Sequence, residues 1–228
     1  GGSIFASTLG TPDYSFSSRG AALTAFDRVE LSIARQDLRL DTLGPALGLS
    51  DPHLRMDVYG LKLRAYGDLV YGRWPQLSLG MQYKHHRDFA VPGLVGAREN
   101  SDIDYYLAAS RLYLAAAGGY NLLLNATLRR TRANQGGLLG FGGDRSNSHS
   151  WQPELAAAVL FRPELVLGVE WRDKPDNLGF AREDAWSDVF VGWFPNKQLA
   201  LVLAYADLGS VAGLDAQRGW YLSLQLAP

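Results

Sequence analysis

Apolar and polar side chains alternate with a period of two residues along most of this 228-residue chain. Between Tyr120 and Arg129, every even position is Tyr, Leu or Ala, whereas most odd positions are polar. The pattern recurs in residues 59–68, 76–86, 165–172 and 220–226. Successive side chains of a β-strand point to opposite faces, whereas a helix would scatter these residues around its circumference. The chain is therefore predicted to be all-β, with one apolar face on each strand.

The connections between these strands also alternate, between short and long. Short links are predicted at residues 26–28, 72–75, 118–119, 162–164 and 195–197, and longer polar links at 39–55, 86–101, 130–150, 173–183 and 207–218. Outer-membrane β-barrels have short periplasmic turns and longer outer loops. A β-sandwich has no reason to keep this rhythm, so the connections favour a barrel.

Twelve strands fit between these links. They are predicted near residues 2–9, 14–26, 29–38, 55–70, 76–87, 102–115, 120–132, 150–162, 165–173, 184–194, 199–207 and 217–226. Only the Ala- and Leu-rich segment from Tyr105 to Ala117 is also compatible with a helix. An even number of strands returns both termini to one side of the membrane. Residues 1–228 are therefore predicted to form a single domain, a transmembrane antiparallel up-and-down β-barrel.

Alternation alone does not decide which face points inward. In water, the apolar face would form the core of a lipocalin-like barrel or a sandwich; in a membrane, it would face lipid. Aromatic residues near the predicted strand ends favour the membrane, because Trp and Tyr concentrate at its two interfaces. They are Tyr14, Tyr59, Trp74, Tyr120, Trp151, Trp171, Trp193, Tyr205 and Trp220. A closed barrel also leaves no edge strand to aggregate. We therefore predict a bacterial outer-membrane protein that contacts membrane lipid and lipopolysaccharide and is inserted by the barrel-assembly machinery.

Composition argues against several other classes of protein. The 22 basic and 23 acidic residues leave a net charge of -1, which does not favour a nucleic-acid partner. Without cysteine, the chain has no disulfide framework and no cysteine nucleophile. His85 and His86 are adjacent and point to opposite faces of a strand, and no Asp spacing resembles a calcium loop. We predict no metal and no cofactor.

Two loop segments could carry a function. His149 within Ser146–Ser150 suggests a serine hydrolase, but a catalytic Ser and His must meet through the fold with a third, orienting group. No catalytic residue is therefore predicted, and the protein is not expected to be an enzyme. The Gly-rich segment at residues 136–143 surrounds Leu138, Leu139 and Phe141. It is interpreted as a mobile outer loop, or as one that folds into the lumen as a constriction.

The polar faces of the strands carry charges of both signs, which we predict to line the lumen. The candidate selectivity residues are Glu30, Lys62, Arg64, Asp68, Lys84, Arg129, Glu154, Glu170 and Arg172. A strongly selective pore would show rings of one sign. Mixed signs indicate an ion-paired, partly filled lumen or a narrow, weakly selective channel.

Several segments resemble a family of bacterial outer-membrane-like proteins known only as domain of unknown function 3034. These segments are residues 1–5, 13–15, 26–32, 184–188, 193–197, 204–209 and 219–225. The resemblance extends over essentially the whole chain and implies export and a barrel. It implies no activity.

Three functions are considered on this basis. The first is a narrow channel or transport barrel for a small solute, without cofactor or covalent chemistry. The second is a plugged structural or partner-binding barrel of an envelope complex. The third, which is disfavoured, is a lipid-acting enzyme. The permeant, the protein partners and the oligomeric state do not follow from the sequence.

Overall fold

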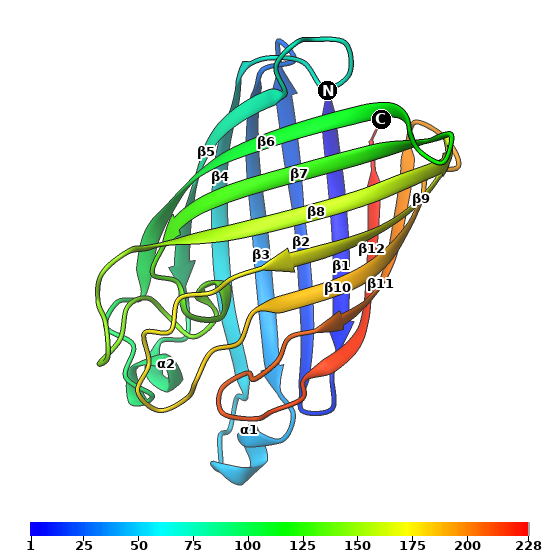
Figure 1. Ribbon diagram of the computed structural model, residues 1–228. Coiled ribbons are helices and arrows are strands. Elements are labelled where there is room, and N and C mark those ends of the chain that lie inside the picture. The colour runs from blue at the N-terminus through cyan, green and yellow to red at the C-terminus, as the bar shows by residue number, and fades with distance from the viewer. Residues whose placement is uncertain (228) are drawn as a thin grey trace.

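The computed structural model describes residues 1–227, and they form one closed antiparallel β-barrel (Figure 1). Each of the twelve strands pairs with the next in sequence, and β1 closes the barrel on β12. The strands are β1 (Gly2–Gly10), β2 (Tyr14–Ala25), β3 (Val29–Leu40), β4 (His53–Tyr66), β5 (Gln76–His86), β6 (Ser101–Ala117), β7 (Tyr120–Thr131), β8 (Ser150–Arg162), β9 (Leu165–Arg172), β10 (Trp186–Trp193), β11 (Leu199–Asp207) and β12 (Arg218–Leu226). The predicted fold class is confirmed.

The predicted strand ends agree with the structure to within two residues, with one exception. Strand β4 was expected to continue to residue 70, but it ends at Tyr66 after a register shift between Arg64 and Tyr66. Beyond it, the Asp68 carboxylate accepts hydrogen bonds from the backbone N–H groups of Val70 and Tyr71, both 2.9 Å long. These bonds hold a turn that the alternating pattern does not reveal. The segment with helical character, Tyr105–Ala117, lies within β6.

The two ends of the barrel differ in their connections. The turns at residues 26–28, 67–75, 118–119, 163–164 and 194–198 lie at one end, where Figure 1 also places both termini. The links at 11–13, 41–52, 87–100, 132–149, 173–185 and 208–217 lie at the other end, which by this asymmetry is the outer end. Two short helices, α1 (Leu43–Ala46) and α2 (Ala90–Leu94), belong to these outer loops. No helix of residues 1–227 is long and apolar enough to cross a membrane.

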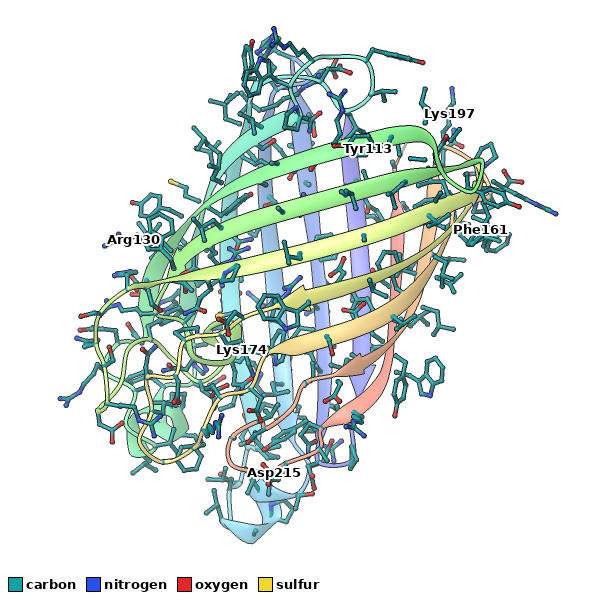
Figure 2. The ribbon with its side chains drawn as sticks, in the orientation of Figure 1. Tyr113, Arg130, Phe161, Lys174, Lys197 and Asp215 are labelled. Atoms are coloured by element: carbon teal, nitrogen blue, oxygen red, sulfur yellow. The ribbon has the colours of Figure 1, made fainter. Side chains whose placement is uncertain are left out.

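The outward face of the barrel is an apolar belt bordered by aromatic side chains. Large apolar residues that would be buried in a soluble protein are 36% exposed or more, including Leu31, Leu107, Leu167 and Val189. Figure 2 shows Tyr113 and Phe161 near the inner end and Arg130 near the outer end. Of the predicted interfacial aromatics, those exposed on the outside are Tyr59, Trp74, Tyr120, Trp151, Trp171, Trp193, Tyr205 and Trp220. The apolar faces therefore point to lipid, as expected for a membrane barrel.

The prediction for Tyr14 is wrong. Its side chain points into the barrel, is 2% exposed, and donates a hydrogen bond of 2.9 Å to the backbone oxygen of Val211. Tyr14 begins β2 directly after the short outer link at residues 11–13, so its ring lies beneath the neighbouring loop and not against lipid.

Candidate functional site

A network of charged side chains crosses the lumen wall from β5 to β8. Lys84 Nζ lies 2.7 Å from Asp104 Oδ2, and Arg129 Nη1 lies 3.8 Å from the same oxygen. Arg129 Nε then donates to Glu154 Oε1 at 2.6 Å. The side chain of Asp104 is fully buried, and those of Lys84, Arg129 and Glu154 are at most 18% exposed. Alternating signs on neighbouring strands allow each charge to be paired within the wall.

Neutral side chains complete the surroundings of Arg129. Its Nη1 donates to Gln82 Oε1 at 3.0 Å, and its guanidinium lies 5.0 Å from the centre of the Tyr106 ring. The ring fits there because position 80 is glycine: a Cβ would lie 2.2 Å from Tyr106 Cζ. Arg129 is thereby held on several sides, which makes it a fixed part of the wall.

The wall continues along β9 and β10. Arg172 lies directly opposite Glu154 in the register, and its Nη2 is 3.5 Å from Glu170 Oε2. Asp188 lies directly opposite Glu170 and shares the inward face. We call Lys84, Asp104, Arg129, Glu154, Glu170 and Arg172 the charged wall. Its charges alternate in sign around one side of the lumen, as the mixed-sign prediction requires.

The remaining predicted lumen residues lie toward the inner end. Glu30 and Lys62 face each other across β3 and β4 on the inward face. Arg64 also starts inward, but its guanidinium turns to the inner turn, 3.3 Å from Asp68 Oδ2. The assignment of Asp68 to the lumen is wrong, because this residue lies in the turn beyond β4 and its carboxylate holds that turn.

The outer mouth is closed by an apolar cluster that we call the outer seal. Loop residues Ala133, Leu138, Leu139, Phe141, Leu178, Val211 and Ala212 pack against inward-facing Tyr14, Leu38, Leu40, Leu54, Met56 and Val58. Phe141 and Met56 are fully buried. Gly137, with a φ of 112°, allows this contact, since a Cβ there would meet Met56 Sδ at 2.7 Å. Of the two interpretations of residues 136–143, the structure has the loop folded into the lumen.

Two inward-facing side chains of β5, Lys84 of the charged wall and His86, bind the outer seal. Lys84 Nζ donates to the backbone oxygen of Gly136 at 2.9 Å. His86 Nε2 lies 2.8 Å from the backbone oxygen of Leu138. Both bonds join β5 to the loop at residues 132–149. The position of the seal is therefore coupled to the ion pairs of the lumen.

A buried polar clasp joins three outer loops across the mouth. Lys174 Nζ lies 3.0 Å from Glu183 Oε2 and donates to Gln135 Oε1 at 3.2 Å. Gln135 Nε2 donates to Glu183 and, at 3.1 Å, to the backbone oxygen of Ser210. The Lys174 ammonium also lies 5.0 Å from the Trp186 ring centre. Figure 2 labels Lys174 where the segment after β9 crosses the outer end.

Burying the charged groups of the clasp costs hydration free energy. Loss of hydration raises the pKa of Glu183 and lowers the pKa of Lys174, even though each group is attracted to the other. The side chains are only 1% and 4% exposed. A buried ion pair of this kind favours one particular arrangement of the loops more than it stabilises the fold.

Beneath the seal lies a cavity of about 620 Å³. Its lining includes the charged wall on one side, and apolar side chains such as Phe16, Val202 and Phe190 on the other. Gln135 and Lys174 of the clasp contribute to its roof. The cavity thus has charged side chains on one side and apolar side chains on the other, and loop residues cover it toward the outer end.

The catalytic candidates do not form a catalytic group. His149 Nε2 lies 3.0 Å from Asp102 Oδ2, which also accepts from Arg132 Nε at 2.5 Å. Within residues 1–227, no serine hydroxyl is hydrogen-bonded to a histidine, so His149 has an acid partner but no nucleophile. His53 instead lies 2.7 Å from Asp37, on the outside of the barrel. No cluster of three or more possible metal-ligating side chains occurs in the part of the chain that the structure describes.

Asp104 and the clasp were missed by reasoning from the sequence. Asp104 immediately precedes the segment with helical character, yet Asp102, Asp104 and Tyr106 alternate with apolar residues, and this signal could have identified it. Lys174, Glu183 and Gln135 come from three separate stretches of two loops, and no spacing in the sequence brings them together.

A closed antiparallel barrel with lipid-facing apolar side chains and a polar lumen defines an outer-membrane β-barrel protein. Residues 1–225 match the family described as "Protein of unknown function (DUF3034)", and the chain belongs to that family. No curated protein matches the sequence.

Solved outer-membrane proteins share the fold at very low sequence identity. The NanC porin has a TM-score of 0.60 at 8% identity, with 100% of this chain and 98% of the porin covered. Omp33 from Acinetobacter baumannii has a TM-score of 0.54 at 8% identity, with 100% of this chain and 97% of Omp33 covered. An outer membrane channel from Pseudomonas putida F1 has a TM-score of 0.51 at 11% identity, with 98% of this chain and 92% of the channel covered. At these identities, the likeness is one of fold alone.

Proposed function

We propose that this protein is a narrow outer-membrane channel for small polar solutes, with its outer mouth closed in this structure. The observation that carries the proposal is the charged wall beside a cavity of about 620 Å³. A purely structural barrel gains little from such a wall, because removing ionised groups from water costs more than pairing them returns. A wetted passage keeps these groups hydrated whenever the seal opens.

The chemistry of the wall also supports a choice of permeant class. Its charges alternate in sign, so neither anions nor cations are strongly favoured. Two proteins with this fold, the NanC porin and the outer membrane channel from Pseudomonas putida F1, belong to the proposed class. The permeant is therefore a small polar or zwitterionic solute, and the chamber requires no cofactor.

Conductance of the protein in planar bilayers tests the proposal. One variant replaces residues 134–143 with a Gly-Ser linker and so removes the outer seal, while the charged wall stays in place. A control variant replaces residues 45–47 at the end of α1, which are exposed. We expect small or infrequent steps from the wild type and the control, and large steady steps from the seal variant. A seal variant that folds but carries no current would overturn the proposal.

The outer seal itself favours a second candidate, a plugged barrel that binds a partner of the envelope. An apolar core at the mouth is what a permanent plug requires. This candidate predicts that neither variant conducts current, because the cavity would not connect the two sides of the membrane. The same recordings therefore separate the two functions.

We further propose that the protein is not an enzyme and that the barrel-assembly machinery inserts it. In support of the first point, His149 faces Asp102 and no serine hydroxyl bonds it among residues 1–227. Lipid hydrolysis that depends on His149 would contradict this, as judged by comparing wild type with His149→Ala. Depletion of the assembly machinery should reduce the folded protein in the outer membrane, and an unchanged amount would contradict the second point.

A further inference from the structure

Three arginines lie on the outside of the barrel directly above the apolar belt. On β4 and β5, the belt ends at Tyr59 and Tyr83, whose ring centres are 6.2 Å apart. Toward the outer end, the outward side chains become charged: Arg19 on β2, Arg35 on β3, and Arg87 directly after β5. All three are exposed. They therefore lie at the height where the head groups of the outer leaflet begin.

Arg35 and Arg87 are held by one buried carboxylate. Arg35 Nε donates to Asp57 Oδ1 at 2.9 Å, and Arg87 Nε donates to Asp57 Oδ2 at 2.6 Å. The Asp57 side chain is 10% exposed, whereas those of the arginines are 44% and 47% exposed. Each guanidinium uses only its Nε on Asp57. The terminal nitrogens, which can bind phosphate oxygens in pairs, form no hydrogen bond within residues 1–227.

Arg19 adds a positive charge that no acid of the barrel compensates. It lies directly opposite Arg35 in the β2–β3 register and forms no ion pair among the described residues. Like charges in directly opposed positions destabilise a sheet. Arg35 and Arg87 share one carboxylate and Arg19 lies opposite Arg35, so the three arginines carry two positive charges in excess of Asp57.

The excess of positive charge does not extend to the neighbouring arginine. Arg55 lies opposite Arg87 and is surrounded by Asp51 at 3.0 Å, Asp88 at 3.4 Å and Asp37 at 3.7 Å. Acids outnumber the arginine there, so Arg55 does not attract an anion. The anion-binding position is consequently limited to Arg19, Arg35 and the Arg87 guanidinium that Asp57 holds.

We infer that Arg19, Arg35 and Arg87 bind a phosphate monoester of a glycolipid in the outer leaflet. A phosphate monoester has a charge near -2 at neutral pH, which matches the excess charge of the site, whereas a phosphodiester has a single charge. The outer end of the barrel meets the glycolipid leaflet, and the aromatic pair Tyr59–Tyr83 places the acyl chains just below. This inference does not depend on whether the lumen conducts.

Lipid retention measured by native mass spectrometry tests the site. The protein is reconstituted into phosphatidylethanolamine vesicles that contain bis-phosphorylated lipid A, phosphatase-treated lipid A or phosphatidylglycerol. It is then transferred to detergent, and the lipid bound to each folded barrel is counted. From the loss of charge-assisted bonds, Arg19→Gln should lower retention about threefold or more, and the triple variant R19Q/R35K/R87K about tenfold or more.

The variants are chosen so that folding is preserved. Arg19→Gln breaks no ion pair, and the two lysines keep a cation for Asp57 while removing the forked donors. Arg162→Gln, an exposed arginine at the inner end of β8, is the matched control and should retain the lipid. Equal retention of phosphatase-treated lipid A or phosphatidylglycerol would overturn the inference, as would retention unaffected by either variant.

Discussion

Replacing Glu183 with glutamine should open the outer mouth without unfolding the barrel. The substitution preserves the shape of the side chain and a hydrogen-bond acceptor for Gln135. It leaves the Lys174 ammonium, 4% exposed, without the carboxylate that lies 3.0 Å away. Removing one partner of a buried ion pair costs about 3–5 kcal/mol. The strands do not depend on this contact, so the cost affects the closed arrangement of the loops.

The expected effect on the loops follows from that free energy. Every 1.4 kcal/mol is a factor of ten, so the population with an open clasp should rise by about two to four orders of magnitude. Hydrogen exchange reports such local opening through amides that are protected only when the loop is closed. Suitable reporters are Asn134 N–H, bonded to Gly140 O at 3.0 Å, and Phe141 N–H, bonded to Glu99 O at 3.0 Å.

The hydrogen-exchange measurement needs a control variant and amides that serve as an internal reference. Asp215→Asn removes an exposed carboxylate from the last outer loop and should leave both amides protected. Amides of the strands, such as those of β7, should exchange equally slowly in all proteins, because the barrel ladder is intact. Unchanged exchange at Asn134 and Phe141 in the Glu183→Gln variant would refute the role assigned to the clasp.

Three further predictions concern the mouth and the lumen. The double variant Lys174→Met and Glu183→Met should restore part of the closure lost in Glu183→Gln, because it removes the uncompensated buried ammonium, although the buried Gln135 amide loses two partners. Exchange at Phe141 as fast as in Glu183→Gln would contradict this. Two substitutions are compared in the variant that lacks residues 134–143. Arg172→Gln should move the reversal potential toward cation selectivity. Arg64→Gln should move the reversal potential less, because the Arg64 guanidinium pairs with Asp68 in the inner turn. Equal shifts would show that the two side chains face the lumen alike. Tyr14→Phe should weaken the seal by about 1 kcal/mol, since the buried oxygen of Val211 loses one of its two donors and keeps only the Leu214 N–H at 3.0 Å. Hydrogen exchange at the Val211 amide checks this, and unchanged protection would argue against the bond.

Most of the lumen assignment could be read from strand parity. Lys84, Arg129, Glu154, Glu170 and Arg172 lie on the inward face because each shares the parity of its polar neighbours. Parity predicts on which face of a strand a side chain lies, but not which charged residue it pairs with. Whether Arg129 pairs with Glu154 or Asp104 depends on the register between strands, which the tertiary structure sets.

Two assignments failed for different reasons. Asp68 follows a register shift in β4, so the alternation that holds along β4 no longer predicts the face of this residue. Tyr14 has the same parity as the inward-facing Phe16 and Ser18, so counting along β2 places it in the lumen, and its aromatic side chain at the strand end did not indicate an interfacial position. Its partner, the backbone oxygen of Val211, comes from a loop distant in sequence.

The sequence by itself determined the class of this protein. A period of two over twelve segments, with short and long links in alternation, is compatible with few folds other than a membrane barrel, because the backbone must be fully paired within the membrane. The tertiary structure alone decided that the mouth is closed. Gln135, Lys174, Glu183 and Ser210 lie together because the closed barrel holds three loops at the same rim. Contacts between loops depend on that three-dimensional closure, and no local periodicity encodes them.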